Sequence, residues 1–456
     1  MAISGLDAAL SGLRVAQQQL NVISANVANV STPGYTRKIL PQESSVIMGE
    51  TAGVRSSAVI RKVDLNLERD LWTQVSSTES LGVKAGYLNQ IQQFHGSTDA
   101  EISIAAEIAR LRNAFVELAN APDDNLLLQQ AVTEAGQVAG KFNTFAGMLT
   151  QMRNDAQDQM RVSVDTVNAR LAEIADLNRQ IKANTALGRS SAALEDLRDS
   201  AIKELSAEMQ ITFFTRGDGV LVVQTSQGHQ LADENVTPLF FAPSPVGPAS
   251  SYPASAAGIY IGGDPAKVQT AFDITNTNIG GKIGAYIELR DQIMPRYQAQ
   301  LDELAHKTAM RFDAQGVRLF TDATGAIPAD TAPVPNPPGP LTPVPYVGFA
   351  SVIRVNDAIE NNYSLLRTGT LSGLTVQDGS SEFLRRIVEF TFGDFEYLQA
   401  QGNVDLRVST VPTVHGESVV MRVLDRASVR LSLEDMGFER ETLASFNQLI
   451  HRPHGI

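Results

Sequence analysis

The sequence predicts a mainly α protein with an inserted β domain, elongated and multi-domain, with long coiled-coil-like helices and a small α+β tail. Three observations support this fold class. Apolar residues recur at steps of three or four from about 126 to 184, the spacing of one helix face. At Ile211–Val223 the pattern changes to β-branched and aromatic residues around a Gly-Asp-Gly turn, which predicts a hairpin. A helix of the first length spans tens of ångströms at about 1.5 Å per residue, so we expect a rod-shaped body.

Composition excludes several classes of function. The 456 residues carry a net charge of −13 and no Lys/Arg-rich run, which argues against nucleic acid as a partner. Cysteine is absent, which rules out disulfides and thiolate chemistry. No run of 18 apolar residues is present, so we expect no membrane span, and the N-terminus lacks the basic and apolar regions of a cleaved signal peptide.

The first 36 residues form an amphipathic helical pattern with almost no charge. Only Asp7 and Arg14 are ionisable. The apolar stripe consists of Ile3, Leu6, Leu10, Leu13, Ala16, Leu20, Ile23, Val27 and Val30. Pro33 and Gly34 stop the helix, because proline lacks an N–H and glycine relaxes φ. Such a helix suits packing against similar helices in an assembly better than standing alone in water.

The rest of the chain is predicted in segments. Residues 1–63 are expected to contain the N-terminal helix and a turn-rich segment of short strands or loops. Residues 64–206 are expected to form the first half of a helical domain, with helices over about 64–95, 99–120, 126–184 and 193–206. Asp123-Asp124 is expected to cap the N-terminus of the third helix, and Gly188 to interrupt the helical pattern after it.

A β domain and a return half complete the helical part. Residues 207–279 form the inserted β domain, in which Pro238–Pro253 is a loop and strands are expected near 257–262 and 270–275. Residues 280–404 form the second helical half, with a helix to about 315 and a proline-rich loop over 328–345 that holds eight prolines.

The N-terminal residues resemble the signature of bacterial flagellar axial proteins. In that family a Leu-rich helix with a Gln run leads into Asn-x-x-Asn-x-x-Thr-x-Gly-(Phe/Tyr). The matching assembly motif here is Leu6, Leu10, Leu13, Gln17, Leu20, Ile23, Asn26, Asn29, Thr32, Gly34 and Tyr35. The alternative is that these residues form an ordinary amphipathic helix that ends at a Pro-Gly pair, with no assembly role.

Internal segments narrow the resemblance to the hook-associated protein 1 group over roughly residues 1–400. They are Asp196-Leu-Arg-Asp199 before Leu205-Ser206, Gly280-Gly-Lys282 with Arg290-Asp-Gln292, and Gly348-Phe349 through Asn356 with Asp378–Leu384. For Arg290 and Asp291 we expect a solvated ion pair rather than a binding role.

The resemblance implies a structural subunit of the flagellum rather than an enzyme. It implies a place at the hook–filament junction, outside the cell, after export without a cleaved signal peptide. The implied partners are the hook protein, neighbouring hook-associated proteins, further copies in a ring, and the flagellar export apparatus with a chaperone. No cofactor and no metal are expected. A secreted coiled-coil adhesin is an alternative that the N-terminal signature disfavours.

Residues 405–456 resemble an unrelated family, the type II secretion and pilus-assembly ATPases. The matching positions are Arg407, Ser409, Thr410, Pro412, Thr413, Gly416, Glu417, Arg422, Leu424, Gly437, Phe438, Arg452, Pro453, His454 and Gly455. We infer a fusion with a join near Val404 to Ser409; a divergent native C-terminus is the alternative. Strands are expected around Leu406–Leu424 and a helix over Leu433–Ile450.

We predict no catalysis from this tail, and no intramolecular partner for the N-terminal helix. The sequence contains no Gly-x-x-x-x-Gly-Lys-(Ser/Thr), so nucleotide would find no phosphate cradle, and the chain reaches Ile456 just before the place where the ATPases carry theirs. The axial family closes with a second amphipathic helix that pairs with the first one, and this tail stands in its place. His415 and His451 suit structural hydrogen bonds better than a metal site.

Overall fold

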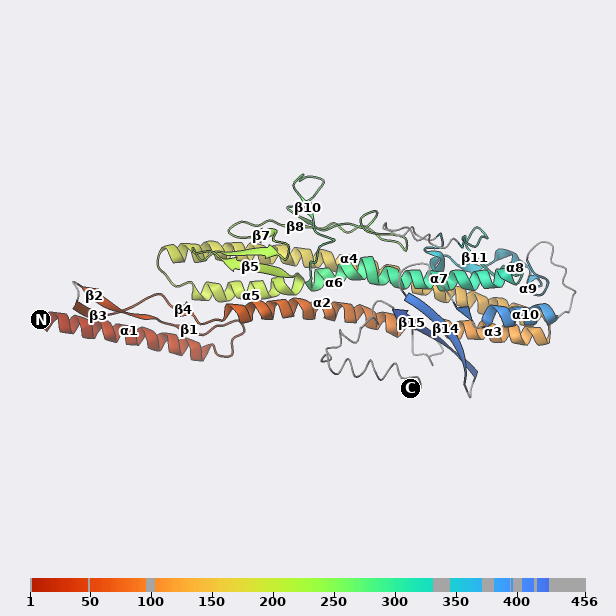
Figure 1. The fold of residues 1–456 in the computed structure, drawn as a ribbon, viewed down its shortest axis with the longest axis horizontal. Coiled ribbons are helices and arrows are strands. Elements are labelled where there is room, and N and C mark those ends of the chain that lie inside the picture. Colours follow the sequence, from red (N-terminus) through yellow and green to blue (C-terminus); the bar gives the residue numbers. More distant parts are fainter. Residues whose placement is uncertain are drawn as a thin grey trace, which may run out of the picture. The chain divides into compact units, whose positions relative to one another are not determined.

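The computed structural model describes residues 2–47, 50–95, 103–330, 345–370, 381–393, 395–396, 404–413 and 416–425. The chain divides into two compact units, residues 1–90 with 150–295 and residues 91–149 with 296–456. Helices dominate both units and the sheets are small, which confirms the mainly α fold with a small β part. Figure 1 shows the elements with their labels.

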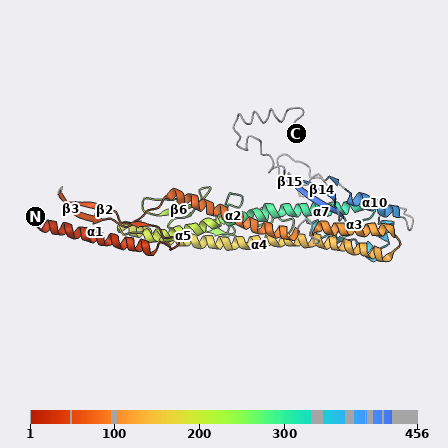
Figure 2. The same cartoon turned by 90° about the horizontal axis from the view of Figure 1, so that it is seen from below.

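The first unit begins with helix α1, Ala2–Ala28, which the apolar spacing predicted. Four short strands follow it: β1 (Lys38–Ile39), β2 (Gln42–Ile47), β3 (Glu50–Ser56) and β4 (Ile60–Arg61). β2 pairs with β3 and β1 pairs with β4, both antiparallel. We call α1 with these strands, residues 2–47 and 50–63, the N-terminal arm. Figures 1 and 2 both show the β2–β3 hairpin alongside α1.

The predicted long helices are present with nearly the expected bounds. They are α2 (Leu65–His95), α3 (Ile104–Asn120), α4 (Asn125–Ala186) and α5 (Ala192–Glu208). The side chain of Asp124 accepts the N–H of Leu126 at 2.8 Å, so Asp124 caps α4 as predicted. Asp123 instead pairs with Arg367. The interruption at Gly188, where φ is +63°, is confirmed.

The 62-residue helix α4 owes its length to one continuous apolar face. Over residues 149–181 the apolar positions at steps of three or four are all buried: Leu149, Met152, Ala156, Met160, Val164, Val167, Leu171, Ile174, Leu177 and Ile181. Isolated helices are marginal in water, so this packing, rather than helix propensity, stabilises α4.

Two three-stranded antiparallel sheets follow α5 in the first unit. They consist of β5 (Ile211–Thr215), β6 (Leu221–Thr225) and β7 (Gln230–Ala232), and of β8 (Leu239–Phe240), β9 (Tyr260–Ile261) and β10 (Phe272–Asp273). The hairpin at 211–223 is confirmed. Strand β8 lies inside Pro238–Pro253, which the prolines had predicted to be loop throughout, because the two residues after Pro238 still pair with β9.

The return helix is interrupted, whereas the sequence predicted one continuous helix to about 315. It consists of α6 (Gly281–Glu288), a π-helical turn (Leu289–Ile293) and α7 (Met294–Ala314). Arg290 is buried within this wider π-helical turn. The turn changes the hydrogen-bond spacing of the helix locally, which the apolar periodicity of the sequence does not reveal.

The second unit packs α3, the start of α4, α7 and later elements around aromatic residues. Phe312 of α7 lies 5.5 Å from Phe115 of α3 and 5.6 Å from Phe320, measured between ring centroids. The later elements are β11 (Phe320–Thr321), a 3₁₀ turn (Phe349–Ser351), β12 (Arg354–Val355), α8 (Asp357–Asn361), α9 (Leu365–Thr368) and α10 (Ser381–Phe392).

The strands predicted around Leu406–Leu424 are confirmed as β14 (Val404–Thr413) and β15 (Gly416–Asp425), and an unpredicted short strand, β13 (Phe395–Glu396), pairs with β14. Together they make a three-stranded antiparallel sheet in which Arg407 is opposite Arg422. The predicted helix Leu433–Ile450, the histidines His415, His451 and His454, and most of the proline-rich loop lie outside the described residues.

Candidate assembly interface

Helix α1 presents its large aliphatic side chains to solvent. Leu6, Leu13 and Leu20 are 72%, 67% and 63% exposed. The exposed apolar row of α1 consists of Leu6, Leu10, Leu13, Leu20, Ile23 and Val27, and Val30 continues it just beyond the end of the helix at Ala28. Soluble proteins rarely leave a contiguous row of this kind uncovered, so the row is a candidate interaction surface. Gln17 is also exposed on this helix.

The opposite face of α1 packs against the arm strands through small and polar side chains. The Ser11 hydroxyl accepts the N–H of Val54 at 3.1 Å, and the Ser56 hydroxyl donates to the Gln18 side chain at 2.7 Å. Val15 is buried between them. The prediction that α1 has no intramolecular partner is therefore wrong, because strands β1 and β3 pack against the face that the aliphatic stripe does not use.

The polar half of the assembly motif acts within the chain. The Asn26 side chain accepts the N–H of Lys38 at 3.0 Å and donates to its carbonyl at 2.8 Å, and the Tyr35 hydroxyl donates to Asn26 at 2.9 Å. Thr32 donates to the Asn29 side chain at 3.2 Å. These bonds turn the chain from α1 into β1, so this half of the motif positions the exposed apolar row.

Gly34 brings this turn against helix α5. Its φ is +79°, and a Cβ built there would lie 2.8 Å from the Ser200 hydroxyl. A side chain at position 34 would combine backbone strain with that close approach. The glycine of the motif is therefore explained by contact between the arm and α5.

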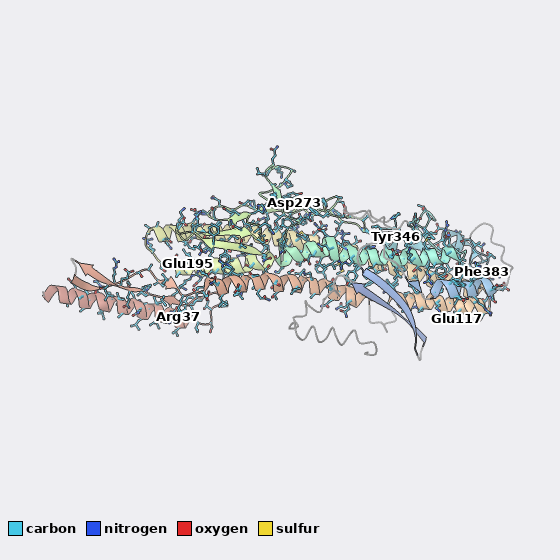
Figure 3. All side chains as sticks on the ribbon, viewed as in Figure 1. Arg37, Glu117, Glu195, Asp273, Tyr346 and Phe383 are labelled. Carbon is cyan, nitrogen blue, oxygen red and sulfur yellow. The ribbon has the colours of Figure 1, made fainter. Side chains whose placement is uncertain are left out.

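A cluster of charged residues fastens the arm to α5. The Lys38 ammonium lies 2.5 Å from Asp196, and the Arg61 guanidinium pairs with Glu195 at 2.7 Å and also with Asp199. We call Lys38, Arg61, Glu195, Asp196 and Asp199 the anchor cluster. Most of its side chains are largely buried, and Glu195 is labelled on α5 in Figure 3. Burial favours the neutral form of Arg61, but Asp199 and Glu195 outweigh it and raise the pKa of that guanidinium.

The Asp196-Leu-Arg-Asp199 segment therefore joins three parts of the first unit. Its two carboxylates hold the arm, while buried Arg198 donates to Asn178 of α4 at 3.0 Å and to the carbonyl of Gly219 at 2.9 Å. The sequence identified this segment by resemblance only and missed Lys38 and Arg61. Little in the sequence indicates that these two residues attach the arm to α5, because isolated basic residues are common in turn-rich segments.

Arg290 is a second correction, since it is fully buried rather than solvated. It pairs with Asp291 at 2.7 Å and donates to the carbonyl of Ala257 at 2.7 Å. Buried Arg153 donates to the carbonyls of Arg290, Gly247 and Ser250 at 2.9, 2.8 and 2.6 Å. The two arginines fix the proline-containing loop of the β region onto α4 and the π-helical turn.

The described residues show neither a metal centre nor a spanning helix. No group of three or more His, Cys, Asp or Glu side chains in them could hold a metal ion. Within the same ranges, no helix combines the length and hydropathy that crossing a bilayer requires.

Comparison with known proteins finds three families along the chain. Residues 88–326 match the flagellar hook-associated protein FlgK helical domain, and residues 6–36 match the flagella basal body rod protein family. Residues 393–456 match the type II/IV secretion system protein family, and this match begins upstream of the predicted join at 404–409.

Two curated relatives agree with these matches. Flagellar hook-associated protein 1 of Escherichia coli K12 is 25% identical over 326 residues, which cover 70% of this chain and 57% of that protein. Type II secretion system protein E of Xanthomonas campestris is 53% identical over 60 residues, 13% of this chain and 11% of that protein. A solved structure of the flagellar hook junction protein FlgK from Burkholderia pseudomallei is 26% identical and covers 59% of this chain and 47% of that chain, with a TM-score of 0.47. The chain thus spans about half the length of the curated flagellar relatives it matches.

Proposed function

Since this chain belongs to the FlgK family of flagellar hook-associated proteins, we propose that it is a structural subunit of the bacterial flagellum at the hook–filament junction. The observation that carries the proposal is the exposed apolar row of α1, which the arm strands hold in place from the opposite side.

The mechanism is helix packing between subunits. Full burial of one leucine side chain contributes about 1.5–3 kcal/mol, so several such residues on one helix can offset the entropy lost on association. Because α1 carries only Asp7 and Arg14 as ionisable residues, close packing of copies brings few like charges together. The exposed Gln17 suits hydrogen bonds between neighbouring helices.

The partners follow from the proposed place in the flagellum. They are the hook protein, neighbouring hook-associated proteins and further copies of this chain in a ring, and before assembly the export apparatus with a chaperone. The protein would act outside the cell after export without a cleaved signal peptide. The β region at 207–279 would face outward, while the helical parts at 64–206 and 280–404 form the body.

We propose no catalytic role for the region at 393–456. It is similar to the type II/IV secretion system protein family, but the sequence contains no Gly-x-x-x-x-Gly-Lys-(Ser/Thr) to hold phosphate. Its strands would form an accessory part of a structural subunit.

Localisation in a flagellated species from which the gene of the junction protein has been deleted tests this function. A tagged full chain should be found at the distal end of isolated hooks by immuno-electron microscopy. A Leu13→Glu and Leu20→Glu variant should reach the medium but be absent from hooks, whereas an Asn21→Glu control should resemble the unmodified chain. Retention of the unmodified chain in the cytoplasm, or hooks without label, would contradict the proposal.

A further inference from the structure

Glu68 lies in the first turn of α2, and charged residues of the anchor cluster act on it through space. Its Oε2 atom is buried and has no hydrogen-bond partner among the described residues. A buried carboxylate oxygen without a donor favours the protonated form of the group.

The charges that act on Glu68 come from two neighbouring elements. Arg61 of β4 and Arg198 of α5 stabilise its ionised form, while Asp196 and Asp199 of α5 oppose it. Both arginines already have other partners, since Arg61 pairs with Glu195 and Asp199 and Arg198 binds Asn178 and Gly219. Glu68 is therefore the carboxylate that this cluster leaves unsatisfied.

Burial raises the pKa of Asp199 as well as that of Glu68, but Asp199 pairs directly with Arg61, whereas the buried Oε2 atom of Glu68 has no partner among the described residues. With every group ionised, four carboxylates face three cations. The carboxylates are Glu68, Glu195, Asp196 and Asp199, and the cations are Lys38, Arg61 and Arg198. Protonation of Glu68 removes the excess negative charge, and it does so where the arm is fastened to α5.

We propose that Glu68 makes the attachment of the N-terminal arm to α5 proton-dependent, firm when this carboxyl is protonated and loosened when it is ionised. The consequence for assembly rests on the proposed function, because the arm carries the exposed apolar row. The response of the joint itself does not depend on assembly.

The direction of the pH effect follows from the charge environment. Burial, and then Asp199, raises the pKa of Glu68 from 4.5 to about 7. The folded protein therefore binds a proton that the opened joint releases between these values. The attachment is firmest at acidic pH and weakens as the pH rises through about 7.

Hydrogen exchange on the full-length monomer tests the proposal. After correction for intrinsic rates, amides of β1 and β4 should exchange several-fold faster at pH 8 than at pH 6, and at most about tenfold faster given solvent screening. Glu68→Gln should remove this difference while leaving the fold unchanged. Glu43→Gln, which alters an exposed pair with Arg55 on the same arm, should keep it.

Trp72 provides a second readout, one turn after Glu68 on α2 and 4.7 Å from the Phe213 ring. Its fluorescence should titrate near neutral pH in the unmodified chain and in Glu43→Gln, but not in Glu68→Gln. Equal pH dependence in all three proteins would overturn the proposal. Because both measurements use monomer, failure to assemble would count against the proposed function alone.

Discussion

The side chain of Asn26 pairs with both backbone polar groups of Lys38, at 3.0 Å to the N–H and 2.8 Å to the carbonyl. An asparagine amide can do this because it carries a donor and an acceptor side by side. The pair joins the last turn of α1 to the first residue of β1 and leaves the ammonium of Lys38 free to reach Asp196. One side chain thus links the helix, the turn and the anchor cluster.

Replacement of Asn26 by alanine should loosen the arm. The change leaves two backbone groups of Lys38 and the Tyr35 hydroxyl without their partner, and we expect a loss of about 1–3 kcal/mol of local stability. Hydrogen exchange at β1 measures it. Asn21→Ala, an exposed position on the same helix, should change exchange little, and equal effects of the two variants would contradict the role given to Asn26.

Charge placed on the exposed apolar row should abolish self-association without unfolding the monomer. Leu13→Glu and Leu20→Glu alter exposed side chains, so we expect stability within about 0.5 kcal/mol of the unmodified chain. Sedimentation velocity at increasing concentration should show assemblies of the unmodified chain and only monomer for the double variant. Val15→Glu, on the buried face, should instead destabilise the arm.

Arg153→Leu should release the loop at 244–250. The guanidinium donates to the carbonyls of Arg290, Gly247 and Ser250, and leucine cannot replace any of these bonds, so we expect a loss of about 2–4 kcal/mol in urea unfolding. Arg161→Leu is the matched control on the same helix. Arg161 is exposed, and its ion pair with Asp165 is long, at 3.7 Å. Equal losses in both variants would show that the bonds to the loop are not responsible.

Two glycines of the helical body should respond to alanine in opposite directions. Gly281 has φ +58°, and a Cβ there would lie 2.5 Å from the carbonyl group of Glu208, so we expect Gly281→Ala to cost roughly 2–4 kcal/mol. Gly136 lies inside α4 with nothing within 4 Å of the added atom, and Gly136→Ala should stabilise by roughly 0.5–1 kcal/mol. Thermal unfolding of both variants measures the contrast, and a neutral Gly281→Ala would contradict the close approach.

The pKa values of two aspartates in the second unit are shifted in opposite directions. Burial raises the pKa of Asp302 to about 6, although the N–H groups of Gly348 and Ala350 favour its ionised form. The Thr324 side chain lowers the pKa of Asp322 below 3.8. Asp302 should therefore weaken the fold as pH rises from about 4 to 6, whereas Asp322 should weaken it as pH falls below its ordinary value.

Carboxyl carbon NMR of aspartate-labelled protein measures both values. The assignment uses Asp302→Asn and Asp322→Asn, each of which removes one resonance. A midpoint for Asp302 near 4 would show that its three hydrogen bonds outweigh its burial.

The sequence by itself determined the secondary structure of most of the described chain. Long apolar periodicity such as that of α4 predicts both the helix and the face it buries. Apolar residues repeated every 3.6 positions lie on one side of a helix, and that side must be covered. It also determined the exposed apolar row of α1 and the two resemblances within one chain. Each of these depends on neighbours along the sequence.

Only the tertiary structure decided which polar residues meet. Arg61 and Asp199 are 138 positions apart, and Arg153 and Arg290 are 137 apart, so no local pattern relates them. The same holds for the face of α1 that β1 and β3 cover, since small and polar residues have no period that predicts a partner. The physical reason is that hydrophobic burial is encoded by spacing, whereas a buried hydrogen bond depends on the positions of two groups that the fold alone brings together.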